Sequence, residues 1–224
     1  MVTKDIKANI KAVEERVNRA CRRVGRSPDE VTIVAVTKTV EPSDIITAFG
    51  EGIRHFGENR IQEAAPKIGQ LLCLEPSPVW HMVGHLQTNK VRLALEIFDI
   101  IHSVDSIRLA ETVSRHTTKN MPVLLEVNVS GEISKNGFPV AEVGPALAAI
   151  SQLPGIEVKG LMTVAPVVTI PEQVRPVFRE LRSLRDSMGL EHLSMGMTDD
   201  FEVAVEEGAT MLRIGRAIFG ERRG

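Results

Sequence analysis

The run VTIVAVT, residues 31–37, is the clearest indication of fold class in this sequence. β-branched residues dominate it, and it holds almost no polar side chain until its end. A strand of this composition is buried on both faces, as in a parallel sheet that is covered by helices. The run therefore predicts a central strand of an α/β fold.

The same alternation of strand and helix continues along the rest of the chain. Further strands are predicted at residues 53–56, 80–83, 100–104, 123–129, 158–162, 192–195 and 211–214. Helices are predicted between them at residues 43–50, 59–72, 87–97, 106–118, 140–152, 172–188 and 199–206. Eight such units favour closure into a (β/α)8 barrel over an open doubly wound sheet. The two short strands, at Ile53 and His192, have the weakest pattern.

A helix precedes the first strand. Its apolar residues recur at spacings of three and four, with charged residues between them, and they are Ile6, Ile10, Val13, Val17, Cys21 and Val24. Gly25 and Pro28 end it. No linker divides the chain, and residues 166–171 form a loop within the repeating pattern. We therefore expect one domain over residues 1–224, a single barrel with an extra N-terminal helix.

Composition excludes several classes of function. The chain has 224 residues, a net charge of −2 and an ordinary 25% of charged residues, so no electrostatic feature suggests nucleic acid as a partner. Its two cysteines, Cys21 and Cys73, lie far apart, which indicates a reducing compartment. The first ten residues hold no apolar segment of the kind that a secretory signal needs, and no apolar run reaches membrane length, so we expect neither a signal nor a membrane span. We expect a cytoplasmic monomer without a membrane partner.

Polar residues and glycines follow the predicted strands. In a barrel of this kind functional groups gather at that end, although loops are polar in any fold. The residues concerned are Lys38, Glu58, Asn59, His81, Gly84, His85, Ser103, Asn128, Thr163, Ser194, Gly196, Arg213 and Gly215. This distribution predicts a site at the carboxyl ends of the strands.

Lys38 closes the first strand, and burial there would lower the pKa of its amine and favour Schiff-base chemistry. From position alone, a lysine that extends past the strand end into solvent is the simpler interpretation. The last two strands carry a second signal. LSMGMTDD, residues 193–200, and MLRIGRAIFG, residues 211–220, place glycines where barrels commonly bind phosphate. Two ordinary strand–helix turns are the alternative.

Taken together, these motifs resemble the pyridoxal phosphate homeostasis protein family, whose members are single-domain relatives of the alanine racemase barrel. The matching stretches run in order from residue 31 to residue 220: VAVTKT, HFGENRIQE, WHMVGHLQTNK, HSVDS, LEVNVS, KGLMT, LSMGMTDD and LRIGRAIFG. The resemblance implies a protein that binds pyridoxal 5′-phosphate (PLP) and buffers, stores or delivers it.

The resemblance also assigns roles to individual residues. It implies that Lys38 holds PLP as a Schiff base and that Arg213 faces the pyridine nitrogen. Asn59 and Met162 would lie beside the cofactor. The phosphate would be held by Ser194 and Gly215 with the backbone N–H groups of Met195 and Gly196. Lys135, in the turn SKNG, matches a second lysine thought to act in cofactor release, although such a turn is also a common surface feature.

The sequence leaves open the roles of two histidines and whether the protein catalyses a reaction. His81 and His85 could be ligands or structural neighbours, and without a third ligand nearby we predict no metal. An amino-acid racemase or other PLP enzyme and a barrel enzyme for another phosphorylated metabolite are the alternatives. Related racemases use a second domain and a tyrosine, and related decarboxylases use a cysteine. This chain has no tyrosine, so we expect a PLP carrier without efficient catalysis that supplies apo PLP-dependent enzymes.

Overall fold

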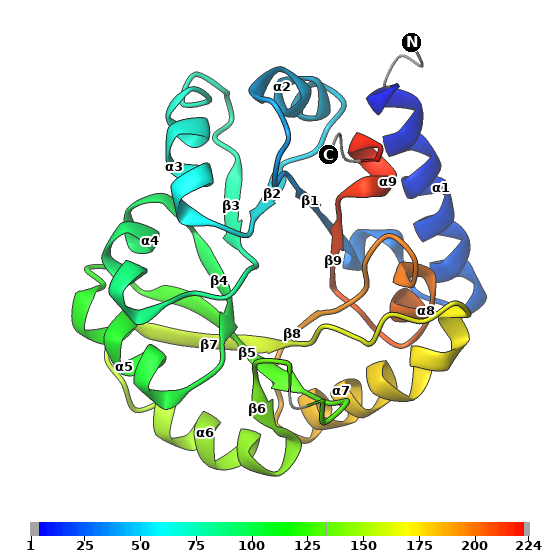
Figure 1. Ribbon diagram of the computed structural model, residues 1–224. Helices are drawn as coiled ribbons and strands as arrows, with labels where there is room; N and C mark the ends of the chain where they lie inside the picture. Colours follow the sequence, from blue (N-terminus) through cyan, green and yellow to red (C-terminus); the bar gives the residue numbers. More distant parts are fainter. Residues whose placement is uncertain (1–4, 133, 222–224) are drawn as a thin grey trace.

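Eight parallel strands close into a barrel in the computed structural model, which describes residues 5–132 and 134–221 (Figure 1). They are β1 (Thr32–Val36), β2 (His55–Glu58), β3 (Val79–Met82), β4 (Ile100–Val104), β5 (Met121–Asn128), β7 (Ile156–Met162), β8 (His192–Ser194) and β9 (Met211–Ile214). The order β4-β3-β2-β1-β9-β8-β7-β5 is closed by pairing of β4 with β5. The two-residue strand β6 (Phe138–Pro139) pairs with the end of β5. The predicted barrel is confirmed.

Helices surround this barrel on its outside (Figure 1). They are α2 (Pro42–Gly50), α3 (Ile61–Gly69), α4 (Val91–Ile97), α5 (Ile107–His116), α6 (Val143–Ile150), α7 (Arg175–Ser187), α8 (Phe201–Glu206) and α9 (Arg216–Phe219). Short 3₁₀ turns at Thr88–Lys90, Val140–Glu142 and Pro171–Val174 form the first turns of three of the predicted helices. No sequence pattern predicted the four-residue helix α9.

The predicted extra helix is α1 (Ile6–Arg23), and it packs against α8, α9 and α2 (Figure 1). Asp5 caps its first turn by accepting a hydrogen bond from the backbone N–H of Ala8 at 2.9 Å. The face predicted to be apolar is the buried face, except that Val24 lies beyond the helix end and is exposed. None of the helices in the described residues has the length and apolar character needed to cross a bilayer.

Strand β2 differs from its prediction by two residues. The apolar pattern predicted residues 53–56, whereas the strand runs from His55 to Glu58. Gly57, which looks like a turn residue in the sequence, lies inside the strand. A Cβ atom there would lie 3.1 Å from Val34 and 3.3 Å from Val83, so the barrel interior leaves little room for a side chain. Glu58 consequently belongs to the strand, and Asn59 is the first residue beyond it.

The core has two parts. A large outer core lies between the barrel and its helices, and a separate small cluster consists of Val34, Ile100, Leu124, Met162 and Met211. Several buried polar side chains also belong to the barrel strands, among them His81, His102, Glu126, Ser194 and Arg213. The interior of this barrel is therefore only partly apolar, which positions polar groups beneath the carboxyl ends of the strands.

Candidate functional site

Lys38 lies in a tight turn at the end of β1. The backbone N–H of Val40 donates to the carbonyl of Thr37 at 3.0 Å, which closes the turn around Lys38 and Thr39. Thr39 has a φ of 61°, a conformation that β-branched residues rarely adopt. Lys38 is half-buried. Backbone strain of this kind concentrates at functional sites, where the surrounding structure holds it in place.

A buried ion pair supports this turn. The ammonium of Lys67, from α3, lies 2.7 Å from Oε1 of Glu58 and 2.7 Å from the carbonyl oxygen of Thr37. The hydroxyl of Thr37 donates to the same carboxylate oxygen at 2.6 Å. Oε2 of Glu58 is buried without a hydrogen-bond partner among the described residues. The pair thus ties the residue before Lys38 to β2 and α3.

Arg213, on β9, is almost completely buried inside the barrel. Its guanidinium donates to Oγ of Ser194 at 2.6 Å and to the carbonyl oxygen of Thr163 at 2.7 Å. Burial lowers the pKa of Arg213 to about 10, so the guanidinium is still charged at neutral pH. Both of these hydrogen-bond partners, a hydroxyl and a backbone carbonyl, are uncharged. Val34 of β1 is its register partner, which places Arg213 on the strand next to β1, the strand that leads to Lys38.

The two glycine-containing loops predicted to hold phosphate lie side by side. Oγ1 of Thr198, after β8, accepts a hydrogen bond from the backbone N–H of Ala217, after β9, at 3.3 Å. Gly196 has a φ of 92°, and a Cβ atom there would lie 2.6 Å from Ala204. Only glycine fits this turn, because the left-handed conformation and the close approach of α8 both exclude a side chain.

The other residues predicted around the phosphate already have contacts within the protein. The backbone N–H of Met195 donates to the carbonyl of Met211 at 3.2 Å, and the N–H of Arg213 donates to the carbonyl of Gly196 at 3.0 Å. Ser194 is fully buried, and its hydroxyl contacts Arg213. A Cβ atom on Gly215 would lie 3.4 Å from the carbonyl oxygen of Val36, so Gly215 is close to the chain leading to Lys38.

Asn59 and Met162 flank this region from opposite sides of the barrel. Asn59 is half-buried directly after β2, and its backbone packs so tightly against Gly84 that a Cβ atom there would overlap it at 2.3 Å. Met162 ends β7, is fully buried, and belongs to the small cluster that contains Val34 and Met211. The predicted site residues thus come from β1, β2, β7, β8 and β9 at one end of the barrel.

Glu126, which the sequence did not single out, is a further titratable group there. It lies near the end of β5 and is mostly buried. Burial, and secondarily the carboxylate of Asp105, raises the pKa of Glu126 to about 6, against an opposing effect of Arg213. Asp105 in turn pairs with Nδ1 of His85 at 3.1 Å. This end of the barrel therefore carries carboxylates as well as cations.

The two histidines of the WHMVGHLQTNK stretch have different surroundings. His81 belongs to β3 and is buried, whereas His85 is about half-exposed and contacts Asp105. Within the described residues no three histidine, cysteine, aspartate or glutamate side chains gather as a set of metal ligands. Cys21 is buried in α1, and Cys73 is exposed beyond the end of α3.

Lys135 lies near the end of β7. Its ammonium pairs with Oε1 of Glu132 at 2.7 Å and donates to the carbonyl oxygen of Val164 at 3.1 Å. Val164 comes two residues after the last residue of β7, so Lys135 is on the same side of the barrel as the site. This placement agrees with a surface lysine beside the site and does not by itself assign it a role.

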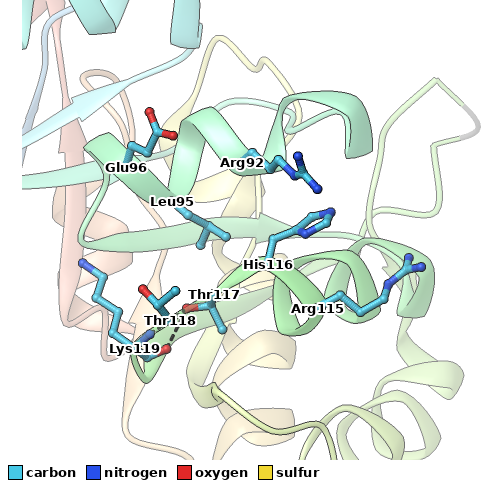
Figure 2. A pocket seen from close by; sticks show the side chains of 8 residues that line it. All are labelled: Arg92, Leu95, Glu96, Arg115, His116, Thr117, Thr118 and Lys119. Atoms are coloured by element: carbon cyan, nitrogen blue, oxygen red, sulfur yellow. Dashed lines mark hydrogen bonds between the residues drawn. The ribbon is translucent and has the colours of Figure 1, made fainter.

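A cavity of about 510 Å³ opens at the opposite end of the barrel (Figure 2). It lies between α4 and α5, and Thr117 to Lys119, which line it, immediately precede β5. Figure 2 shows the charged ends of Arg115 and Lys119 pointing away from one another. The cavity is thus separate from Lys38, and Arg115 and Lys119 do not converge on one ligand.

Comparisons with known proteins agree with this geometry. The chain matches the family model for the alanine racemase N-terminal domain over residues 8–223. A pyridoxal phosphate homeostasis protein from Aquifex aeolicus is 43% identical over 220 residues, which cover 94% of this chain and 96% of that protein. PipY from Synechococcus elongatus PCC7942, solved with PLP bound, has a TM-score of 0.80 and 35% identity, and covers 92% of this chain and 100% of its own.

An alanine racemase from Corynebacterium glutamicum shares the fold alone, with a TM-score of 0.66 and 17% identity, and this chain spans 62% of it. The fold and the site thus define a barrel of the alanine racemase N-terminal class. Within that class, the chain belongs to the pyridoxal phosphate homeostasis protein family. The resemblance that the motifs indicated is confirmed.

Proposed function

We propose that this chain binds PLP covalently through Lys38 and takes part in PLP homeostasis by buffering, storing or delivering the cofactor. The observation that carries the proposal is the pairing of two groups on neighbouring strands. Lys38 lies in the strained turn after β1, and a buried guanidinium with uncharged hydrogen-bond partners lies on β9. The family relatives named for PLP homeostasis, and the PLP bound in PipY, support it.

The donor set fits PLP. Arg213 has no direct hydrogen bond to a carboxylate among the described residues, although the charges of Asp200 and Glu126 act on it. The pyridine nitrogen of PLP is an uncharged acceptor of the same kind as its present partners. Arg213 would donate to that nitrogen while keeping its own proton, because arginine stays protonated in proteins. When bound, PLP supplies an aldehyde for the lysine and a ring that withdraws electrons best when its nitrogen is protonated. Arg213 therefore favours holding the cofactor over catalysis on it.

The phosphate would lie between the two loops that meet at Thr198 and Ala217. Gly196 and Gly215 bring backbone N–H groups close to this position, and the Thr198 hydroxyl is a further donor. Ser194 and Met195 would support the loops from within, because Arg213 and Met211 already engage their hydroxyl and N–H groups. Asn59 and Met162 would border the ring.

Borohydride reduction followed by peptide mass mapping tests the attachment site. Purified protein loaded with PLP should give one stable adduct, on Lys38, and Lys38→Ala should lose both the adduct and the visible absorbance of bound cofactor. Lys135→Ala is the matched control and should keep both. An adduct that maps to Lys90 or Lys135 in the unsubstituted chain would overturn the assignment.

Phosphate recognition has its own test. Pyridoxal, which lacks the phosphate, should bind much more weakly than PLP. Each charge-assisted hydrogen bond that is lost removes about 1.5–3 kcal/mol, so several lost bonds correspond to far more than a tenfold difference in Kd. Fluorescence titration of the two compounds measures this ratio. Equal affinities would contradict a phosphate cradle in the loops after β8 and β9.

A PLP racemase is the second candidate, because solved racemases share this fold. Racemisation needs acid–base groups on both faces of the α-carbon. Lys38 could serve one face, whereas Cys21 is buried in α1 and the chain has no tyrosine. PLP-loaded protein, incubated with L-amino acids in deuterated water, should exchange the α-proton no faster than free PLP does. Exchange at enzyme-like rates, abolished in Lys38→Ala, would establish the racemase instead.

We also propose that the recipients of the cofactor are apo PLP-dependent enzymes. Lys38 is only partly buried and lies at the carboxyl ends of the strands, and this position supports exchange of the cofactor with an amine of another protein. Transfer from loaded protein to an apo enzyme, followed by the recovery of that enzyme's activity, should exceed the rate of spontaneous PLP release if delivery is by contact.

A further inference from the structure

A continuous chain of hydrogen bonds crosses the barrel interior from β2 to β9. Nδ1 of His55 lies 2.9 Å from Nε2 of His81, and Nδ1 of His81 lies 2.8 Å from Nε2 of His102. Nδ1 of His102 lies 2.8 Å from Oγ of Ser194, which accepts from Arg213 at 2.6 Å. The chain begins at the first residue of β2 and ends at the guanidinium of the proposed cofactor site.

The central part of this chain is closed to water. His81 is 1% exposed, and His102 and Ser194 are 0% exposed, whereas His55 is half-buried. Burial lowers the pKa of His81 to about 3, and burial together with His81 and Arg213 lowers the pKa of His102 in the same direction. Both rings are therefore neutral at physiological pH, with one donor and one acceptor nitrogen each.

The direction of the chain follows from its last member. Arginine can only donate, so Oγ of Ser194 is the acceptor in its contact with Arg213. The Ser194 hydroxyl then has His102 Nδ1 as the acceptor for its own proton. His102 consequently carries its proton on Nε2 and donates to His81, which in turn donates from Nε2 to His55. Every donor in the chain then meets an acceptor.

The opposite direction is less favourable. If His102 donated to Ser194 from Nδ1, the serine oxygen would receive two donors and its own proton would lack an acceptor within the chain. A buried hydroxyl proton without a partner is destabilising. The chain is also unsuited to conduct protons into the site, because it ends on a group that keeps its protons. Its geometry serves to orient rather than to transport.

We infer that His102, supported by His81 and His55, is a positioning residue for Arg213. By accepting the Ser194 proton it turns the serine lone pairs toward the guanidinium, which the Thr163 carbonyl holds on its other side. Two of the five guanidinium protons are fixed in this way, and the remaining N–H edge keeps one orientation. The inference deepens the proposed function and rests on it where the cofactor is concerned.

The apo protein provides the first test. NMR of ¹⁵N-histidine-labelled protein at pH 7 should show His81 and His102 neutral, with the proton on Nε2, and Ser194→Ala should remove this single-tautomer state. In ¹⁵N-arginine-labelled protein the Arg213 side chain should be rigid, and should become mobile in Ser194→Ala. His192→Gln is the matched control, since His192 is a half-buried strand residue outside the chain. A His102 proton on Nδ1, or unchanged Arg213 mobility in Ser194→Ala, would overturn the inference.

PLP affinity provides the second test. His102→Leu removes both hydrogen bonds, and the Kd for PLP should rise about tenfold, which corresponds to about 1.4 kcal/mol. His102→Gln retains a donor and an acceptor and should restore most of the affinity. Ser194→Ala serves if His102→Leu does not fold. Equal affinity in a folded His102→Leu or Ser194→Ala variant would contradict a positioning role. If the unsubstituted chain binds no PLP, the proposed function fails, and the arginine mobility measurement alone still decides the inference.

Discussion

The Lys67 ammonium lies between the Glu58 carboxylate and the carbonyl of Thr37, beneath the turn that carries Lys38. Lys67→Met would leave the Glu58 charge buried without its cation. Breaking a buried ion pair in this way costs about 3–5 kcal/mol of folding free energy. We therefore expect a large loss of stability in urea unfolding at pH 7, together with weaker PLP binding.

Two further variants separate charge from packing. In Glu58→Gln/Lys67→Met both partners are neutral, so much of the lost stability should return. Lys7→Met is the control for loss of a lysine charge, because its pair with Glu51 is at the surface, and no measurable change is expected. A double variant as unstable as Lys67→Met would show that packing, rather than the unpaired charge, causes the loss.

Glu126 gives a pH-dependent prediction. Its pKa is about 6 in the folded protein, chiefly because of burial, and that of an unfolded glutamate is about 4.3. The folded protein therefore binds an extra proton between these values, and this contribution to stability is lost as pH rises toward 6. Glu126→Gln removes the effect, so the variant should exceed the unsubstituted chain in stability at pH 8 by about 2 kcal/mol and match it near pH 4.

Urea unfolding of both proteins at pH 4 and pH 8 measures this difference. Glu14→Gln, on the exposed side of α1, controls for the exchange of one carboxylate for an amide. A Glu126→Gln variant less stable than the unsubstituted chain at pH 8 would mean that the ionised carboxylate contributes more through Arg213 than burial removes.

Single residues differ in how far the sequence predicts them. Lys38 stands out because it ends an apolar strand, and Gly196 because the LSMGM run leaves a glycine before a helix. Lys67 and Glu126 do not, because a charged residue inside an amphipathic pattern is ordinarily exposed. Their burial depends on partners that come from other elements, and no local pattern encodes those partners.

The observed helices and strands agree best with their predictions where the periodic apolar pattern extends over many residues. The eighteen-residue helix α1 and the eight-residue strand β5 lie close to their predictions. Strand β2 is shifted because Gly57 fills an interior position that excludes side chains, whereas sequence patterns treat glycine as a turn residue. Helix α9 is too short to show any periodicity.

The docking of α1 onto α8 and α9 can be tested by substitution. Ile10 is buried in this interface, and Ile10→Ala should lower the free energy of unfolding by about 2–5 kcal/mol through lost contacts and a cavity. Lys11→Ala, on the exposed side of the same helix, should change stability little. Urea unfolding measures both, and equal small effects would show that α1 contributes little to the stability of the barrel.

The whole molecule should be sensitive to acid because of its interior histidines. Burial lowers the folded-state pKa of His81 to about 3 and that of His102 in the same direction, whereas unfolded histidine has a pKa of about 6.5. Their contribution to stability is therefore complete above about pH 6.5, the pKa of unfolded histidine, and is lost as the pH falls below it. Each histidine contributes a slope of about 1.36 kcal/mol per pH unit, opposed between about pH 4.3 and 6 by Glu126.

Unfolding free energies at pH 7, 6 and 5 measure this slope. His102→Gln should make it shallower, since one group that binds a proton only in the unfolded state is gone. Burial also lowers the pKa values of His55 and His192, so part of the slope should persist in the variant. An unchanged slope in His102→Gln would show that His102 is not neutral in the folded state.

Closure of the barrel explains what the sequence could not predict. His55, His81 and His102 belong to three different strands, and each looks like an isolated polar residue in its own stretch. They form a chain only because β2, β3 and β4 are neighbours and their inward positions alternate in the same register. The number of strands was predictable from the repeated strand–helix pattern. Which side chains meet inside the barrel depends on the register in which the strands pair, and the sequence does not give that register.

The pairing of β4 with β5 has one further consequence. Within the described residues each barrel strand has a neighbour on both sides, and the two-residue β6 lies against the end of β5. In this part of the chain the closed barrel leaves no strand edge longer than that of β6, so it offers no template onto which a stray polypeptide could add and grow into fibrils. Such a molecule can persist at high concentration without polymerising through its strands, and any encounter with another protein must use its helices and loops.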